Sequence, residues 1–293
     1  MMRKADYEGI ESAPRWILLF LAAYLAAGMV AVYLWNAAGN IFSIQGGTGS
    51  TSALPVTGMA AVDLWLCLVV LRSFPAGSPL RGAWLLMALA AGLRVVSGVM
   101  GSLAGSEAPA VAAAGGPVQL ALLAAGLFRL LGVLRGFGFW RRPAVADWAV
   151  CGVAVLFTLC RLAELAAAWL AGSPIRVESW VAVAGLPILC VLVLEARLLR
   201  QSVVSIGNGL IARVWVALEC GILLTGACEL ALWVVPHYSR TLPLAMFQAL
   251  IRLPAAAAFA LAPAYQVAAQ RRATKPASVP TGDLATGTPA LAE

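Results

Sequence analysis

Eight separate stretches of this chain are each long and apolar enough to cross a lipid bilayer. A membrane-spanning helix needs about 20 predominantly apolar residues, and such stretches lie at 16–35, 56–73, 82–101, 118–135, 148–171, 179–197, 210–235 and 242–268. The chain is 62% hydrophobic and 11% charged, whereas about 25% of the residues in a soluble domain are charged. The sequence therefore predicts an all-α fold, a polytopic membrane bundle of about eight transmembrane helices.

The number of spans depends on two segments. The stretch 16–35 is longer than the apolar core of a signal peptide, which has roughly 7–15 residues, so we interpret it as an uncleaved first helix. The segment 101–117 is rich in Gly and Pro and is expected to be a loop. Seven spans, with one weak segment dropping out, is the alternative count.

Polar tails flank the predicted transmembrane domain of residues 16–269. Residues 1–15 form an N-terminal tail, and residues 270–293 are rich in Pro, Ala, Thr and Gly. A segment of that composition buries too little apolar surface to fold alone. We expect both tails to be cytoplasmic and the second to be disordered.

The basic residues divide unequally between alternate connections. One side carries fourteen of them, namely Arg3, Lys4, Arg15, Arg72, Arg81, Arg135, Arg141, Arg142, Arg197, Arg200, Arg213, Arg271, Arg272 and Lys275. The other side carries two, Arg176 and Arg240. Because cytoplasmic connections are enriched in Lys and Arg, this asymmetry predicts an even number of spans with both termini in the cytoplasm. We expect an integral protein of a bacterial cytoplasmic (inner) membrane.

Two short matches indicate a 4+4 repeat. Residues 66–71, LCLVVL, match 189–194, LCVLVL, and at the same offset of 123 residues LFRL at 127–130 matches LIRL at 250–253. These matches pair the second predicted span with the sixth and the fourth with the eighth. Since each half would hold an even number of spans, the two halves would run parallel. Leucine-rich helices also match by chance, so chance similarity is the competing interpretation.

Four acids and four bases fall inside the predicted spans. A charge at the bilayer centre costs at least about 2.5–3.5 kcal/mol, so these groups must pair or line a polar cavity. Their equal numbers favour pairing, and the exclusive use of Arg suits bidentate contact with carboxylates. The eight residues are Asp63, Glu164, Glu219, Glu229, Arg94, Arg129, Arg161 and Arg252.

Spacing and depth suggest how these charges are grouped. Arg161 and Glu164 are three residues apart on one helix and are expected to form an intramembrane ion pair. We hypothesise that the other six residues serve a ligand or ion site. Glu229, Arg94 and Arg252 would line one cavity, Glu219 and Arg129 would meet at its floor, and Asp63 would lie near mid-membrane.

The alternative is an ion-pair network that only fixes helix packing. Glu195, near the end of its span beside Arg197 and Arg200, is expected to be interfacial.

The sequence lacks the residues that several kinds of functional site require. The single histidine, His237, excludes a bis-histidine haem and a multi-histidine metal centre within this chain, and both lysines lie in the tails. The six cysteines lie in apolar runs without a CxxC spacing and are interpreted as buried packing residues. The positive charge follows the topology of the chain rather than a nucleic-acid surface. We expect no cofactor, no metal and no nucleic-acid partner.

Three function classes remain open. The first is a small-solute or ion transporter that uses the buried Glu/Arg site. The second is a membrane sensor or assembly subunit that binds a ligand or another membrane protein. The third is an intramembrane enzyme with a buried carboxylate as acid or base, although we identify no catalytic residue. In each case the lipid bilayer is the constant partner.

Overall fold

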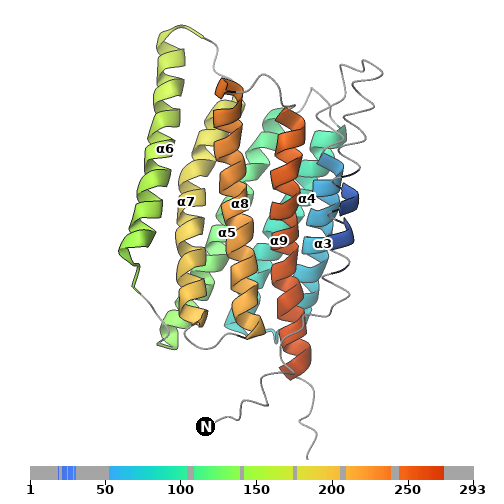
Figure 1. The fold of residues 1–293 in the computed structure, drawn as a ribbon. Helices are drawn as coiled ribbons and strands as arrows, with labels where there is room; N and C mark the ends of the chain where they lie inside the picture. Colours follow the sequence, from blue (N-terminus) through green and yellow to red (C-terminus); the bar gives the residue numbers. More distant parts are fainter. Residues whose placement is uncertain are drawn as a thin grey trace, which may run out of the picture.

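The structure is a computed structural model, and it describes residues 19, 22–24, 26–28, 30, 53–103, 109–138, 142–173, 177–204, 209–238 and 244–273. The described part of the chain contains no strand, and its backbone is dominated by long helices that lie side by side (Figure 1). These are α3 (Ala53–Ser73), α4 (Pro79–Leu103), α5 (Pro109–Gly136), α6 (Val145–Leu170), α7 (Val177–Val204), α8 (Leu210–Tyr238) and α9 (Leu244–Ala273).

Five of these helices are long and apolar enough to cross a membrane, namely α3, α4, α5, α6 and α8. The helices α7 and α9 occupy two further predicted spans, so the all-helical bundle is confirmed. The first predicted span, 16–35, lies mostly outside the described residues, and its described residues are helical. The count of eight therefore stays a prediction.

The prediction of a loop at 101–117 is wrong for most of this segment, because residues 101–103 and 109–117 are helical. The helix α4 continues to Leu103, and α5 already begins at Pro109. Pro117 lies inside α5, where it packs near Gly185 of α7. Gly and Pro are more frequent in membrane helices than in soluble ones, because neighbouring helices help to satisfy the backbone groups that Pro leaves free. The Gly and Pro content of this segment was therefore a poor indicator of a loop.

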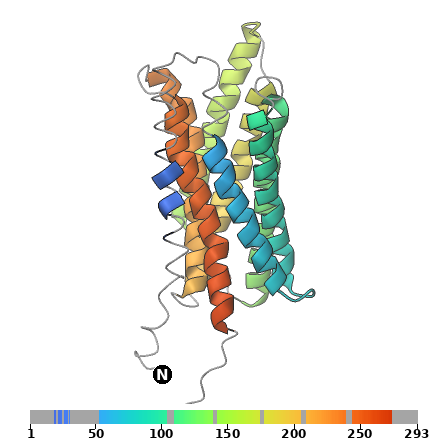
Figure 2. The same ribbon diagram turned by 90° about the vertical axis from the view of Figure 1, so that its right-hand side faces the viewer.

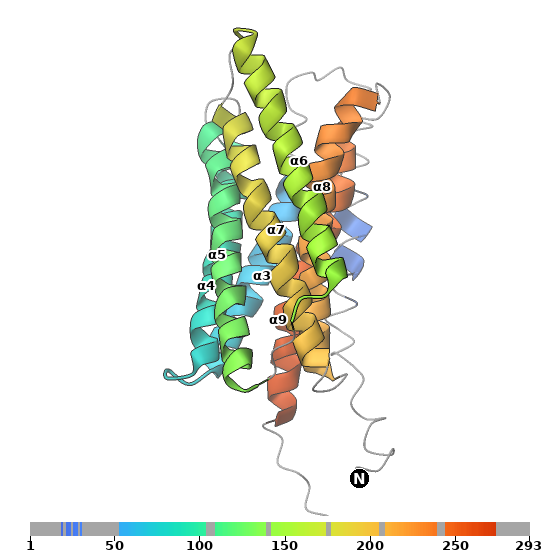
Figure 3. The same cartoon turned by 90° about the vertical axis from the view of Figure 1, so that its left-hand side faces the viewer.

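Six helices form a closed ring. In order around the ring, α3 packs against α4, α4 against α5, α5 against α7, α7 against α8, α8 against α9, and α9 against α3. The apolar core lies within this ring and includes Leu127, Leu192, Leu199 and Ile222, all fully buried or nearly so. The helix α6 lies outside the ring against α7 and crosses obliquely in front of α7 and α8 in Figure 3.

Alanines line the contact between the first and last helices of the ring. Ala256, Ala257, Ala260 and Ala264 of α9 are buried against α3 around Met59. Small side chains let two helix backbones approach closely, and Figure 2 shows α3 and α9 side by side. On the outside of this contact, the hydroxyl of Tyr24 donates a hydrogen bond to the carbonyl oxygen of Pro55 at 3.1 Å.

The ring places the two matched pairs of segments opposite each other. The first match relates α3 to α7 and the second relates α5 to α9, and in the ring each helix lies three places from its counterpart. Both members of each pair run in the same direction (Figure 1). The order and direction of these helices fit a parallel duplication, but the second match does not, because residues 127–130 lie near the end of α5 and residues 250–253 near the start of α9. The duplication itself remains a proposal.

The direction of the helices supports a topology experiment. The helix α3 begins at the end of the bundle opposite to the end where α9 finishes (Figure 1). Nine of the fourteen basic residues are described, and they lie toward the end where α9 finishes, which we call the arginine-rich end; they are Arg72, Arg81, Arg135, Arg142, Arg197, Arg200, Arg213, Arg271 and Arg272. We expect reporter fusions after residue 50 and residue 293 to report opposite sides of the membrane, with the second in the cytoplasm. The same side for both fusions would contradict the even-span topology.

Candidate functional site

A small cavity, mostly apolar in its lining but carrying one acid and one base, lies within the ring. Residues from α3, α4, α5, α8 and α9 line it, among them Asp63, Arg94 and Trp215. Its volume is about 20 Å³. A cavity must offer about 10–15 Å³ to hold one water molecule, so in this conformation it has room for a water and for no larger solute.

Asp63 enters the cavity from the inner face of α3. Met59, Leu66 and Val70 are buried on the same helix, and Asp63 takes its place among them with a relative exposure of 6%. Cys67, one turn further along, donates a long hydrogen bond from its thiol to Asp63 Oδ1 at 3.6 Å. A buried carboxylate is costly without polar partners, so the partners of Asp63 determine what this site can do.

Arg94 of α4 supplies the positive charge of the cavity. Its guanidinium lies over the ring of Phe259 from α9, 4.4 Å from the centroid, which is cation–π geometry. The side-chain amide of Gln119 also contacts Arg94, and with its oxygen assigned to the side facing the guanidinium it accepts from Nε and Nη2 at 2.9 and 2.5 Å. The charge of Arg94 also attracts Asp63 across the cavity. Three helices thus hold one guanidinium beside one buried carboxylate.

One donor in the cavity wall is unused. Trp215 of α8 lines the cavity, and its buried Nε1 has no hydrogen-bond partner among the described residues. Buried polar groups are nearly always hydrogen-bonded to protein or ordered water. The cavity therefore combines an ionisable oxygen, a cation and an unsatisfied N–H group around a water-sized space.

A second polar group lies at the arginine-rich end and joins α6 to α7. Asp147, three residues after the N-cap of α6, accepts a hydrogen bond from the backbone N of Ala144 at 2.8 Å. Arg197 of α7 donates from Nε to Asp147 Oδ1 at 2.6 Å, and the side chain of Asp147 has no exposed surface. Gln201 adds weaker contacts at 3.5 Å.

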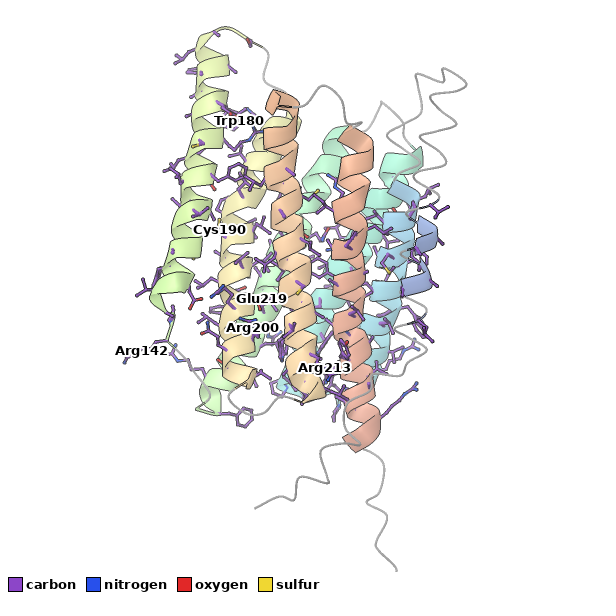
Figure 4. All side chains as sticks on the ribbon, in the orientation of Figure 1. Arg142, Trp180, Cys190, Arg200, Arg213 and Glu219 are labelled. Atoms are coloured by element: carbon purple, nitrogen blue, oxygen red, sulfur yellow. The ribbon has the colours of Figure 1, made fainter. Side chains whose placement is uncertain are left out.

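Glu219 has a different partner from the one predicted. Arg200 Nε lies 2.8 Å from Glu219 Oε2, which joins α7 to α8 (Figure 4). The expected contact with Arg129 does not form, because α7 lies between α5 and α8 in the ring. The exposed Arg129 instead lies against Gly82 of α4, where a Cβ atom would be 2.6 Å from its Nη1.

The remaining predicted residues lie in two other places. Glu229 and Arg252 lie close to the Cys228 thiol where α8 meets α9, and neither lines the cavity of Asp63 and Arg94. The single cavity predicted for these charges is therefore divided between separate places. Arg161 and Glu164 are joined on α6 as their spacing indicated, with Nη1 2.5 Å from Oε2.

Sequence reasoning missed three polar residues. Gln119 and Trp215 carry no charge and were not considered, although an amide in an apolar run is itself a signal of a polar contact. Glu195 was expected at an interface, but it is buried on α7, and its Oε2 has no hydrogen-bond partner in the described part of the chain. Its sequence neighbours Arg197 and Arg200 contact other carboxylates. Side chains two and five positions further along a helix point in directions different from that of Glu195.

The described ranges contain no candidate metal site. They contain no group of three or more His, Cys, Asp or Glu side chains that could hold a metal ion. The cysteines are free thiols. Comparison of the chain with known protein families, with curated proteins and with solved structures finds no match.

Proposed function

We propose that this membrane protein is an ion transporter and that the cavity between Asp63 and Arg94 carries protons. The observation that carries the proposal is the buried carboxylate of Asp63 in a water-sized cavity within the ring. Ionisable residues inside membrane helices are rare and often mark proton or ion pathways. The small volume favours a proton over the larger solutes that the sequence left open.

The partners of Asp63 support a role as proton carrier. Arg94 favours the ionised carboxylate and burial favours the neutral acid, so the two effects oppose each other. A shift of Arg94 away from Asp63, while it keeps its contacts with Gln119 and Phe259, would change this balance without breaking a helix. The two halves of the ring, α3–α5 and α7–α9, enclose the cavity, as expected of transporters built from repeats with a site at the repeat interface.

A flux assay tests this role. Purified protein is reconstituted into vesicles with a trapped pH indicator, and a potassium gradient with valinomycin imposes a membrane potential. We expect proton entry above that of protein-free vesicles. Asp63→Asn should lower this flux by about 100-fold, because an amide cannot take up or release the proton.

The matched control is Glu164→Gln on α6, which makes the same chemical change outside the ring. It should leave the flux within about twofold of the native value, since its side chain does not line the cavity. Equal flux in the native protein and Asp63→Asn would contradict the proposal, as would native protein without flux.

A membrane subunit is the second candidate, and α6 is the observation that favours it. Among the described helices, this helix packs mainly against α7, and it exposes Trp148, Val153, Leu156 and Trp169. Its ion pair of Arg161 and Glu164 is also partly exposed, at 28% and 39%. A charged pair facing lipid is costly, whereas a partner protein could cover it. Purified chain without proton flux would favour this candidate.

A further inference from the structure

An apolar groove opens between α6, α7 and α8. It has a volume of about 420 Å³, within the range of about 300–1,000 Å³ that is typical of ligand pockets. From α6 it is lined by Val153 and Phe157, from α7 by Leu189 and Val193, and from α8 by Leu223, with further small and apolar residues between them.

Small side chains on α8 keep this groove open. Gly226 and Ala227 line it where larger residues would fill it. A Cβ atom on Gly226 would meet only Leu189, at an ordinary contact distance of 3.5 Å. Close helix packing therefore does not explain the glycine. The groove offers an occupant apolar contacts along its length and almost no hydrogen bonds, which suits a hydrocarbon chain.

Two arginines lie just beyond one end of the groove. Arg197 follows the lining residue Val193 by four positions, and Glu219, the partner of Arg200, precedes Leu223 by four. Four positions are about one helical turn on the same face. In Figure 4, Cys190 of the groove lies above the labelled Glu219 and Arg200, and Arg142 lies lower still, beyond the start of α6.

Both arginines have donors left over. Each contacts its carboxylate through Nε, at 2.6 Å for Arg197 and 2.8 Å for Arg200. A guanidinium carries four further N–H donors on its two Nη atoms, and both side chains are partly exposed. Such a guanidinium can donate two parallel hydrogen bonds to a phosphate. The exposed Arg142 adds a third positive charge at this end.

We propose that this groove binds one acyl chain of an anionic phospholipid, with the lipid phosphate bound by Arg197 and Arg200. The arginines lie in the last two turns of α7, at the arginine-rich end, where a headgroup of the cytoplasmic leaflet would lie. The exposed Trp148 at the start of α6 is typical of the same interfacial level. The acyl chain and the phosphate would thus occupy adjoining surfaces, the first apolar and the second carrying guanidinium donors.

Thermal unfolding of the full chain in detergent tests this site. We compare phosphatidylglycerol and phosphatidylcholine with identical chains, and glycerol 1-phosphate as a headgroup without a chain. Phosphatidylglycerol should bind with an apparent Kd about tenfold lower than phosphatidylcholine, because both carry the phosphodiester but the choline ammonium of the second offsets its attraction to the arginines. Glycerol 1-phosphate should give no shift in Tm. Equal affinities for the two lipids, or an equal shift with glycerol 1-phosphate, would overturn the proposal.

Two sets of variants test the apolar groove and the arginines separately. Ala227→Phe and Val153→Phe place a ring in the groove from opposite walls, and each should abolish the lipid-dependent shift. Ala121→Phe, on an exposed position of α5 outside the groove, is the matched control and should keep the shift. The double variant Arg200→Gln/Glu219→Gln removes a guanidinium without leaving a buried carboxylate alone. It should still bind lipid but lose most of the preference for phosphatidylglycerol.

Two results with these variants would also overturn the proposal. One is an unchanged lipid shift in both phenylalanine variants. The other is an undiminished preference for phosphatidylglycerol in the double variant. Because every readout is a shift relative to the same variant without lipid, a general loss of stability does not obscure the outcome.

Discussion

Asp147→Ala should lower the free energy of unfolding by about 3 kcal/mol, because it breaks a buried ion pair and removes a helix cap. The side chain of Asp147 is fully buried and accepts from both Arg197 and the backbone of Ala144. It also joins α6 to α7, the described helix against which α6 mainly packs. Stability is measured by denaturant titration of the purified chain in mixed micelles.

Asp147→Asn is the matched control. Asparagine keeps an acceptor for the Ala144 amide and loses only the charge, so it should cost about 1 kcal/mol. The partly exposed Cys151 and Cys190 lie on α6 and α7 and report whether α6 stays in place. Their labelling by a maleimide should rise in Asp147→Ala and stay near the native rate in Asp147→Asn. Equal stability of the native chain and Asp147→Ala would contradict this role.

Arg200→Gln should destabilise the protein more than the double variant Arg200→Gln/Glu219→Gln. The carboxylate of Glu219 is 6% exposed and its partner Arg200 is 39% exposed. Removing the arginine leaves a buried charge alone, which costs about 3 kcal/mol, while replacing both groups is often nearly neutral. This cost lies at the low end of the range for broken buried ion pairs, because the Arg200 side chain reaches the surface.

A double-mutant cycle in the same titration measures this coupling. The cycle needs Arg200→Gln, Glu219→Gln and their combination, and it isolates the pairwise contribution to the free energy of unfolding. The pair Arg161 and Glu164, which is more evenly exposed, is a suitable comparison and should show a smaller coupling. A coupling near zero for Arg200 and Glu219 would mean that water already screens the pair.

Local features of the fold were predictable from the sequence, and the helix order in space was not. The span expected at 148–171 corresponds to α6 at Val145–Leu170, because an apolar run of that length has few other stable forms in a membrane. The contact of Arg161 with Glu164 follows from their spacing within one helix. Neither inference requires knowledge of a neighbouring helix.

The predicted site depended on neighbours, and this is why it was divided. Depth along the membrane suggested that Glu219 would meet Arg129, since both were expected in the inner half of the bilayer. Residues at one depth still lie anywhere around a ring, and α7 separates these two. Of the predicted charges, only Asp63 and Arg94 line the central cavity. The uncharged Trp215 lines it with them and Gln119 contacts Arg94, and a search for charges alone finds neither.

Closure of the ring by α3 and α9 sets the order in which the chain can mature. The contact joins the first and last helices of the ring, so it waits until the 200 residues from Ser73 to Ala273 have been synthesised. At ribosomal rates that delay is roughly 10–40 s. During this delay, the inner face of α3, which carries Asp63, is not yet covered by α9. The nascent chain therefore needs the insertion machinery, or an early contact with Arg94 of the next helix, to shelter that carboxylate from lipid.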